Sequence, residues 1–161
     1  MLSLLDGSMY ALGQAFLAPV LIAIGVLFGY AVASVGAVAW QAWQRFCQSA
    51  AGFELVSRWR VAPELGRVAL ERLAQSRLEG VRLAARIAPM LGLVATMIPL
   101  GPALRALGDG RVGELSSALA LAFSAVIVAL ISATLSTLVL SLRRRWYAAE
   151  LDTIDALRTP V

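Results

Sequence analysis

The sequence predicts an all-α integral membrane protein with three transmembrane helices. Two observations support this fold class. Hydrophobic residues make up 60% of the 161 residues, with a mean hydropathy of +0.78, and the charged residues leave three long uncharged stretches. Soluble domains contain about 45–50% apolar residues, so the excess is explained if much of the surface contacts a lipid bilayer.

The uncharged stretches cover residues 7–44, 87–104 and 115–142. A helix needs about 20 apolar residues to cross the hydrocarbon core, so the first and third stretches are long enough. The second is short and contains three prolines. A signal peptide is disfavoured, because residues 1–11 carry no basic residue and the apolar run is too long. We therefore expect transmembrane helices within 1–44, at 87–104 and at 115–142.

The arginines are distributed unequally between the segments that connect these helices. All 14 basic residues are arginines. Twelve lie in residues 45–86 and 143–161, and the other two are Arg105 and Arg111. Because cytoplasmic loops retain the excess of basic residues, we expect the C-terminus in the cytoplasm and the N-terminus on the opposite side of the membrane, which for a bacterial inner membrane is the periplasm.

The connecting segments are assigned from their composition. Residues 45–86 are expected to form a cytoplasmic helical segment. Within it a helix is expected to begin at Pro63 and Glu64 and to run into the second transmembrane helix, because proline and an acid suit a first helical turn. Residues 105–114 contain three glycines and are expected to form a short outer loop. Residues 143–161 are expected to form a cytoplasmic tail.

The composition argues against several classes of function. There is no histidine and one cysteine, so neither a metal nor a cofactor is expected. The arginines flank apolar stretches, which is the pattern of a membrane protein rather than of a nucleic-acid-binding protein. An enzyme is not expected either, since general acid–base catalysis needs titratable groups in a pocket. The acids are spaced to pair with neighbouring arginines, as in Arg67 with Glu71 and Glu79 with Arg82.

Small residues recur at helical spacing in all three stretches. Helices in lipid associate through close backbone approach across such residues. Two interpretations stay open: packing within one chain, or a groove for other copies or a partner helix. Three stripes exceed what three helices need to contact one another, which favours oligomerisation. The stripes comprise Gly25, Gly29, Ala33 and Gly36; Ala85, Ala88, Gly92, Thr96, Pro99 and Ala103; and Ala118, Ala122, Ala125, Ala129, Ser132 and Ser136.

The polar groups within the second and third stretches include the hydroxyls of Thr96 and Ser124. Buried Ser and Thr hydroxyls often donate to the carbonyl one turn earlier; alternatively, Thr96 lines a hydrated ion path. A charged side chain inside the membrane is the usual mark of such a path, and no Asp, Glu, Lys or Arg lies in the three stretches. If ions cross the membrane here, a partner protein must supply the carboxylate.

The segment from Ala88 to Thr96 reads APMLGLVAT. It resembles the APxLGLLGT signature at the start of the second conserved helix of the MotA/TolQ/ExbB proton-channel family. The resemblance covers residues 86–155, while the first helix agrees in topology only. The further segments that are similar to the family are residues 99–104, 122–124 and 143–147.

The resemblance implies an ExbB/TolQ-like channel subunit of an inner-membrane complex that uses the proton-motive force to drive a motor or to energise transport. It implies a homopentamer around the single transmembrane helices of a smaller ExbD/TolR/MotB-like partner, which carries a membrane aspartate. Thr96 matches the first family threonine, and Ser124 is a second candidate for the ion path. The third-helix threonine corresponds to Val126 and the following glycine to Ala129. These departures motivate an alternative, a non-conducting membrane scaffold that keeps the family architecture.

Overall fold

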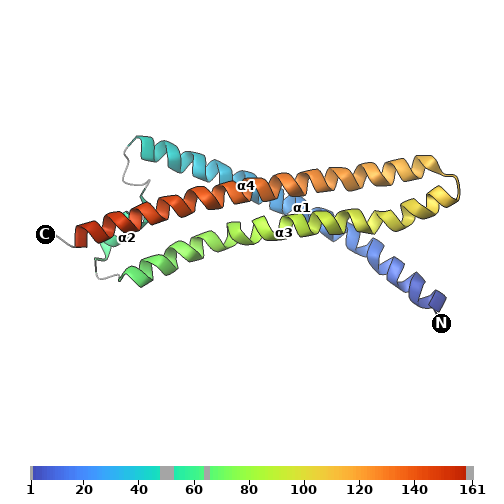
Figure 1. Cartoon of the computed structure of the whole chain (residues 1–161), viewed down its shortest axis with the longest axis horizontal. Helices are drawn as coiled ribbons and strands as arrows, with labels where there is room; N and C mark the ends of the chain where they lie inside the picture. Colours follow the sequence, from blue (N-terminus) through green and yellow to red (C-terminus); the bar gives the residue numbers. More distant parts are fainter. Residues whose placement is uncertain (1, 48–52, 64–65, 159–161) are drawn as a thin grey trace. The chain divides into compact units, whose positions relative to one another are not determined.

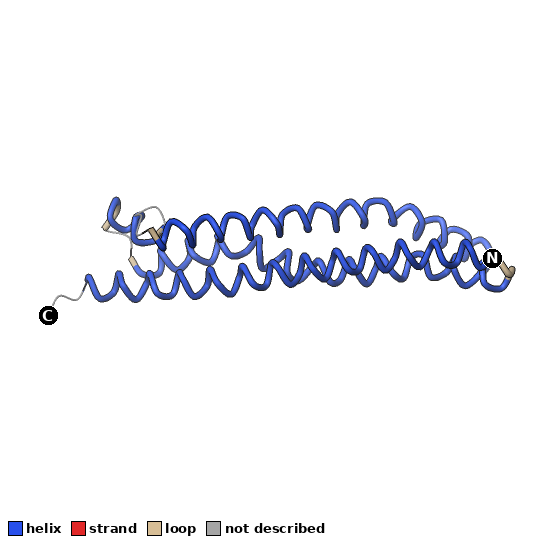
Figure 2. Tube along the Cα trace, turned by 90° about the horizontal axis from the view of Figure 1, so that it is seen from above, coloured by secondary structure: helices blue, strands red, loops and turns tan. Residues whose placement is uncertain are grey.

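The computed structural model describes the backbone of residues 2–47, 53–63 and 66–158. These residues are helical apart from short turns, and no strand occurs among them (Figure 1; Figure 2). The predicted all-α fold class is thereby confirmed. The helices in chain order are α1 (Leu2–Phe46), α2 (Glu54–Val61), α3 (Arg67–Gly108) and α4 (Val112–Arg158).

Three of the helices are long and apolar enough to cross a membrane, as predicted. The spans are Gly13–Phe46, Arg67–Gly108 and Val112–Leu157. The second is α3, which continues through Pro89, Pro99 and Pro102. Each proline lacks an N–H and frees one carbonyl of the preceding turn. Transmembrane helices tolerate this loss because neighbouring helices and side chains satisfy the freed groups.

The segment before α3 differs from the expected continuous helix. The short helix α2 precedes it, and α3 begins at Arg67 rather than at Pro63, which lies in a turn. Glu64, the other residue of the predicted first turn, lies outside the described residues. The first bonds of α3 end on the carbonyl of Gly66, which accepts two amide N–H groups at 3.0 and 3.3 Å. A helix starting at Pro63 would contain Gly66, at a cost of about 1 kcal/mol relative to alanine.

The turn between α3 and α4 comprises Asp109 to Arg111, so both helices extend into the predicted loop. The amide of Gly110 donates to the carbonyl of Leu107 at 3.1 Å, and that of Arg111 donates to Ala106 at 2.8 Å. This pair of bonds is the Schellman arrangement that ends many helices. It requires a left-handed residue, and Gly110 has a φ of +72°.

The chain divides into two compact units, of which the first combines Met1–Tyr30 with Ala85–Thr134. Its core is built largely from small residues of α3 and α4 and aliphatic residues of α1. The buried residues are Val20, Ile24, Ala95, Ala125 and Ala129, against which Leu21, Leu91, Ile98 and Val128 pack.

The second unit combines Ala31–Ala84 with Leu135–Val161. It contains larger buried side chains and includes the whole of α2. One cluster consists of Val38, Val81 and Val139. The other consists of Leu55, Leu70, Ala74, Tyr147 and Ile154.

The small-residue stripe predicted on α1 does not provide the contacts of this helix with the described part of its own chain. All four residues of the stripe are exposed, namely Gly25, Gly29, Ala33 and Gly36. A Cβ added at any of the three glycines would meet no atom within 4 Å. In the first unit α1 packs through Val20 and Ile24 instead. The stripe on α1 therefore faces away from the described part of the chain.

Candidate functional site

The residues expected to form a packing seam or a partner groove are all buried in the first unit. This α3–α4 seam consists of Gly92, Pro99, Ala122, Ala125, Ala129 and Ser132. A Cβ built on Gly92 would lie 2.9 Å from the Cβ of Ala129, so a side chain at position 92 would collide with α4. In this structure the seam packs α3 against α4 within one chain.

The two hydroxyls predicted to line an ion path bond to their own helices. Thr96 is half-buried, and its Oγ1 donates to the carbonyl of Leu93 at 2.7 Å. Ser124 is exposed, and its Oγ donates to the carbonyl of Ala120 at 2.9 Å. The single proton of each hydroxyl is thus used within the helix, as the back-bonding interpretation predicts. Each oxygen keeps lone pairs that can accept a hydrogen bond from a protonated partner group.

Val126 occupies the position at which the resemblance places a threonine. It is half-buried, and a Cβ on Gly92 would lie 3.8 Å from its Cα. A hydroxyl at this position would lie close to the seam. Ser124, two residues earlier in the sequence, points about 200° away around the helix. The structure therefore does not bring the hydroxyl of Ser124 to the place of the expected threonine.

Among the described residues of the first unit, a group of charged side chains lies at the α3–α4 turn. The guanidinium of Arg111 lies 2.7 Å from Asp109 and 2.9 Å from Glu114. The hydrogen bond to Asp109, followed by the charge of Glu114, raises the pKa of Arg111 above its ordinary value. These groups are exposed and lie outside the uncharged stretches, so they add no titratable group to the apolar part of the helices.

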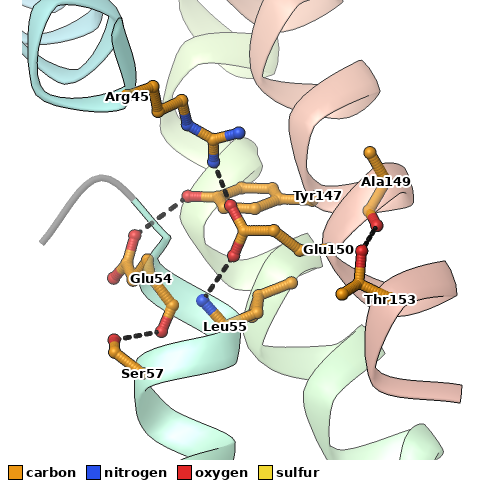
Figure 3. A network of polar contacts seen from close by, with 8 residues as sticks. All are labelled: Arg45, Glu54, Leu55, Ser57, Tyr147, Ala149, Glu150 and Thr153. Carbon is orange, nitrogen blue, oxygen red and sulfur yellow. Dashed lines mark hydrogen bonds and ion pairs between the residues drawn. The ribbon is translucent and has the colours of Figure 1, made fainter. Parts of the chain in front are cut away.

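The second unit contains a polar cluster around a buried carboxylate, and Figure 3 shows its members from α1, α2 and α4. At its centre the carboxylate of Glu150, with 2% exposure, forms an ion pair with Arg45. The same carboxylate accepts the amide N–H of Leu55 at 2.7 Å. These contacts connect the start of α2 and the end of α1 to α4. We call this group, with the three residues introduced next, the Glu150 cluster.

The remaining members of the Glu150 cluster are Glu54, Tyr147 and Arg77. The hydroxyl of Tyr147 donates to Glu54 at 3.1 Å, and Arg77 of α3 pairs with Glu54 at 3.1 Å. The guanidinium of Arg45 also lies over the rings of Phe53 and Trp146, at 4.9 and 4.6 Å from their centroids. Such stacking adds to the fixation of an arginine that is already paired.

Glu150 was not predicted from the sequence, and Tyr147 was included only within residues 143–147, for their similarity to the family. The acids were expected to pair with arginines close to them in the sequence, whereas Glu54 pairs with Arg77 of α3 and accepts the hydroxyl of Tyr147. One signal was present: positions 132, 136, 139, 143, 147 and 150 continue the spacing of the small-residue stripe on α4. An acid on the buried face of a helix needs a partner, but the sequence could not name Arg45, which is 105 residues away.

The two ion pairs expected between neighbouring residues have different outcomes. Arg67 and Glu71 form the expected contact at 2.9 Å. Within the described residues no ion pair links Glu79 to Arg82; both line a cavity of about 280 Å³ in the second unit. The three-residue spacing places Glu79 and Arg82 on the same surface, but their side chains do not form an ion pair. Among the described side chains, no group of three or more His, Cys, Asp or Glu residues could hold a metal ion.

Comparison with known protein families gives a match over more than half of the chain. The model of the MotA/TolQ/ExbB proton channel family matches residues 60–156. The matched region includes α3 and nearly all of α4, and it begins earlier than residue 86, where the motif resemblance starts. No curated protein and no solved structure matches the chain.

Proposed function

Because the chain belongs to the MotA/TolQ/ExbB proton channel family, we propose that it is the channel-forming subunit of an inner-membrane complex driven by the proton-motive force. In this proposal several copies surround the single transmembrane helix of an ExbD/TolR/MotB-like partner. Proton flow through the complex drives a motor or energises a transport process.

One observation carries the proposal: the uncharged stretches of this channel-family member contain hydroxyls but no acidic or basic side chain. A proton path through a membrane needs an ionisable group. A partner helix carrying an aspartate supplies that group. Thr96, at the end of the family signature, is the residue of this chain that would face the aspartate, with Ser124 as a weaker second candidate.

Exposed small residues support assembly into a homo-oligomer. Gly25, Gly29 and Gly36 have open space beside them, so the backbone of another helix can approach α1 closely at these positions. The number of copies, five, comes from the family resemblance. The arginine distribution supports a periplasmic N-terminus and a cytoplasmic C-terminus, with residues 45–86 and 143–161 on the cytoplasmic side.

The test begins with purification of the complex through a tag on this chain. Native mass spectrometry should give five copies together with a single-helix partner that carries a membrane carboxylate. The complex is then reconstituted into proteoliposomes with an entrapped pH dye. Wild type should show proton flux that depends on the partner, and its absence from the purified complex would contradict the proposal.

The role of Thr96 is tested with Thr96→Val in the same assay. Loss of a hydrogen bond from the protonated, neutral carboxyl of the partner, worth about 0.5–1.5 kcal/mol, should lower flux by roughly two-fold to ten-fold. Thr96→Ser should keep most of the flux. Thr134→Val is the control, because Thr134 is an exposed threonine of α4 whose hydroxyl, like that of Thr96, donates to a carbonyl of its own helix, at 2.9 Å. Unchanged flux in Thr96→Val would remove Thr96 from the ion path.

A second candidate function is a non-conducting scaffold. Val126 favours it, since a valine at the threonine position offers no hydrogen bond along the path. Ala129 favours it as well, because this residue fills the space beside Gly92 that a glycine would leave open. An assembled complex with its partner but without measurable proton flux would establish the scaffold function.

A further inference from the structure

A cavity of about 380 Å³ lies in the second unit beside the Glu150 cluster. One face of α2 forms one side of it, with Val56 and Arg60 at helical spacing and Phe53 just before the helix. Residues of α4 and the side chain of Arg45 form the rest. The opposite face of α2 is occupied by Leu55, which is buried in the core of the unit. The cavity is therefore bounded by elements that are packed together.

Among the described residues, the cavity combines apolar walls with one arginine that has no ion pair. Arg45 is neutralised by Glu150, whose second oxygen is used by the amide of Leu55. Arg60 also lines the cavity and has no ion pair within the described part of the chain. Phe53 and Val56 present hydrocarbon surface beside it. The fitting occupant is thus anionic at one end and apolar next to that end.

The cavity is close in sequence to the end of a membrane-spanning helix. Arg45 lies in the last turn of α1. Trp40 and Trp43 lie five and two residues before Arg45 and are 66% and 68% exposed. Tryptophans are enriched at the headgroup level of bilayers, where the apolar ring and the polar N–H are both accommodated. The arginine that borders the cavity therefore lies at the level where lipid headgroups are found.

We propose that this cavity binds the phosphate and glycerol of an acidic phospholipid, with Arg60 contacting the phosphate. A guanidinium forms paired, charge-assisted hydrogen bonds to phosphate oxygens. Phe53 and Val56 contact the glycerol and the first methylenes. Arg45 is held by Glu150 and by the ring of Trp146 at 4.6 Å, so this wall of the site is fixed before the lipid binds. The inference is independent of proton conduction.

The proposal is tested on the purified, delipidated complex by native mass spectrometry with added dioleoylphosphatidylglycerol or dioleoylphosphatidylcholine. Wild type should bind the acidic lipid about ten-fold more tightly than the zwitterionic one, and Arg60→Gln should lower that affinity about ten-fold, as expected for loss of a charge-assisted hydrogen bond. Arg58→Gln is the matched control: Arg58 is an exposed arginine of the same helix that does not line the cavity. It should bind like wild type.

A second pair of variants tests the place of binding without changing charge. Ala149 lines the cavity and is exposed, so Ala149→Leu should fill part of the space and weaken binding. The neighbouring Ala148→Leu, outside the lining, should not. Equal binding of the two lipids would overturn the proposal, as would equal losses in Arg60→Gln and Arg58→Gln. Displacement of the lipid by inorganic phosphate at equal concentration would also overturn it and assign the site to a soluble anion.

Discussion

A glycine at position 92 lets α3 approach α4, and its replacement by alanine tests how the first unit is packed. The new Cβ would lie 2.9 Å from the Cβ of Ala129, whereas carbon atoms in contact prefer about 3.5–4.0 Å. The two helices must therefore move apart by roughly 1 Å at this point. Overpacking of this kind costs about 1–3 kcal/mol. Gly92→Ala should destabilise the first unit by this amount, apart from any gain in helix propensity.

Gly101→Ala separates the collision from the change in helix propensity. Gly101 lies in the same helix, is exposed, and has open space around a built Cβ. Both variants gain up to about 1 kcal/mol from replacing glycine in a helix. The difference between them should therefore report the contact with Ala129. We expect Gly92→Ala to be the less stable of the two by about 1–3 kcal/mol.

The measurement is the free energy of unfolding in mild detergent, titrated with sodium dodecyl sulfate and followed by helical circular dichroism. All variants are compared at the same oligomeric state. The double variant Gly92→Ala with Ala129→Gly moves the methyl group to the other helix and should recover most of the loss, giving a coupling of about 0.5–3 kcal/mol. Equal stability of Gly92→Ala and Gly101→Ala would refute the packing argument, and so would a double variant without recovery.

Two further variants test the second unit and the turn. Glu150→Gln leaves the largely buried Arg45 without its ion pair and should lower the free energy of unfolding by about 3 kcal/mol. Glu71→Gln removes an exposed ion pair and should lower it by less than about 1 kcal/mol. Similar losses in the same detergent titration would contradict the importance of the buried pair. Gly110→Ala places a side chain at φ +72° and should lower the free energy of unfolding by about 1–2 kcal/mol. Gly113→Ala, at the start of α4, should not lower it. Equal effects of the two variants would show that the turn does not require a left-handed residue.

The number of long helices could be predicted because lipid imposes a simple rule on sequence. Charged side chains are costly in the hydrocarbon core, so their absence from three stretches marks three spans. The buried face of α4 could be predicted for a similar reason, since Ala122, Ala125 and Ala129 fall on one face at helical spacing. On α3 the predicted stripe matches the buried face of the helix less closely. Ala95 is buried at 1% exposure, while Thr96, which the predicted stripe contained, is half-buried.

The stripe on α1 shows the limit of such patterns. Gly25 and Gly29 have the spacing of a helix contact, yet they face away from the described residues, and α1 packs through Val20 and Ile24. Small residues permit a close approach, but they do not specify which helix approaches. A second copy of the chain or a partner satisfies the same pattern as an internal contact.

The Glu150 cluster could not be predicted because it depends on contacts between distant segments. Leu55 and Glu150 are separated by 95 residues, and the contact exists only because α2 lies beside α4 in the second unit. Helical spacing reports on one helix at a time. The separation of α2 from α3 was also not predicted. Pro63 suits a first helical turn, but Gly66, three residues later, is unfavourable inside a helix.

The packing chemistry of α4 changes along its length, and the change has a physical cause. In the first unit its buried residues are small, such as Ala125 and Ala129, whereas in the second unit they include Val139, Tyr147 and Ile154. Between helices in lipid, burying a large apolar side chain gains little over contact with lipid, so close backbone approach dominates. In water the same burial gains about 25 cal/mol per Å². The transition from small to large buried residues therefore supports a membrane boundary near the end of residues 115–142, on grounds that do not use hydropathy.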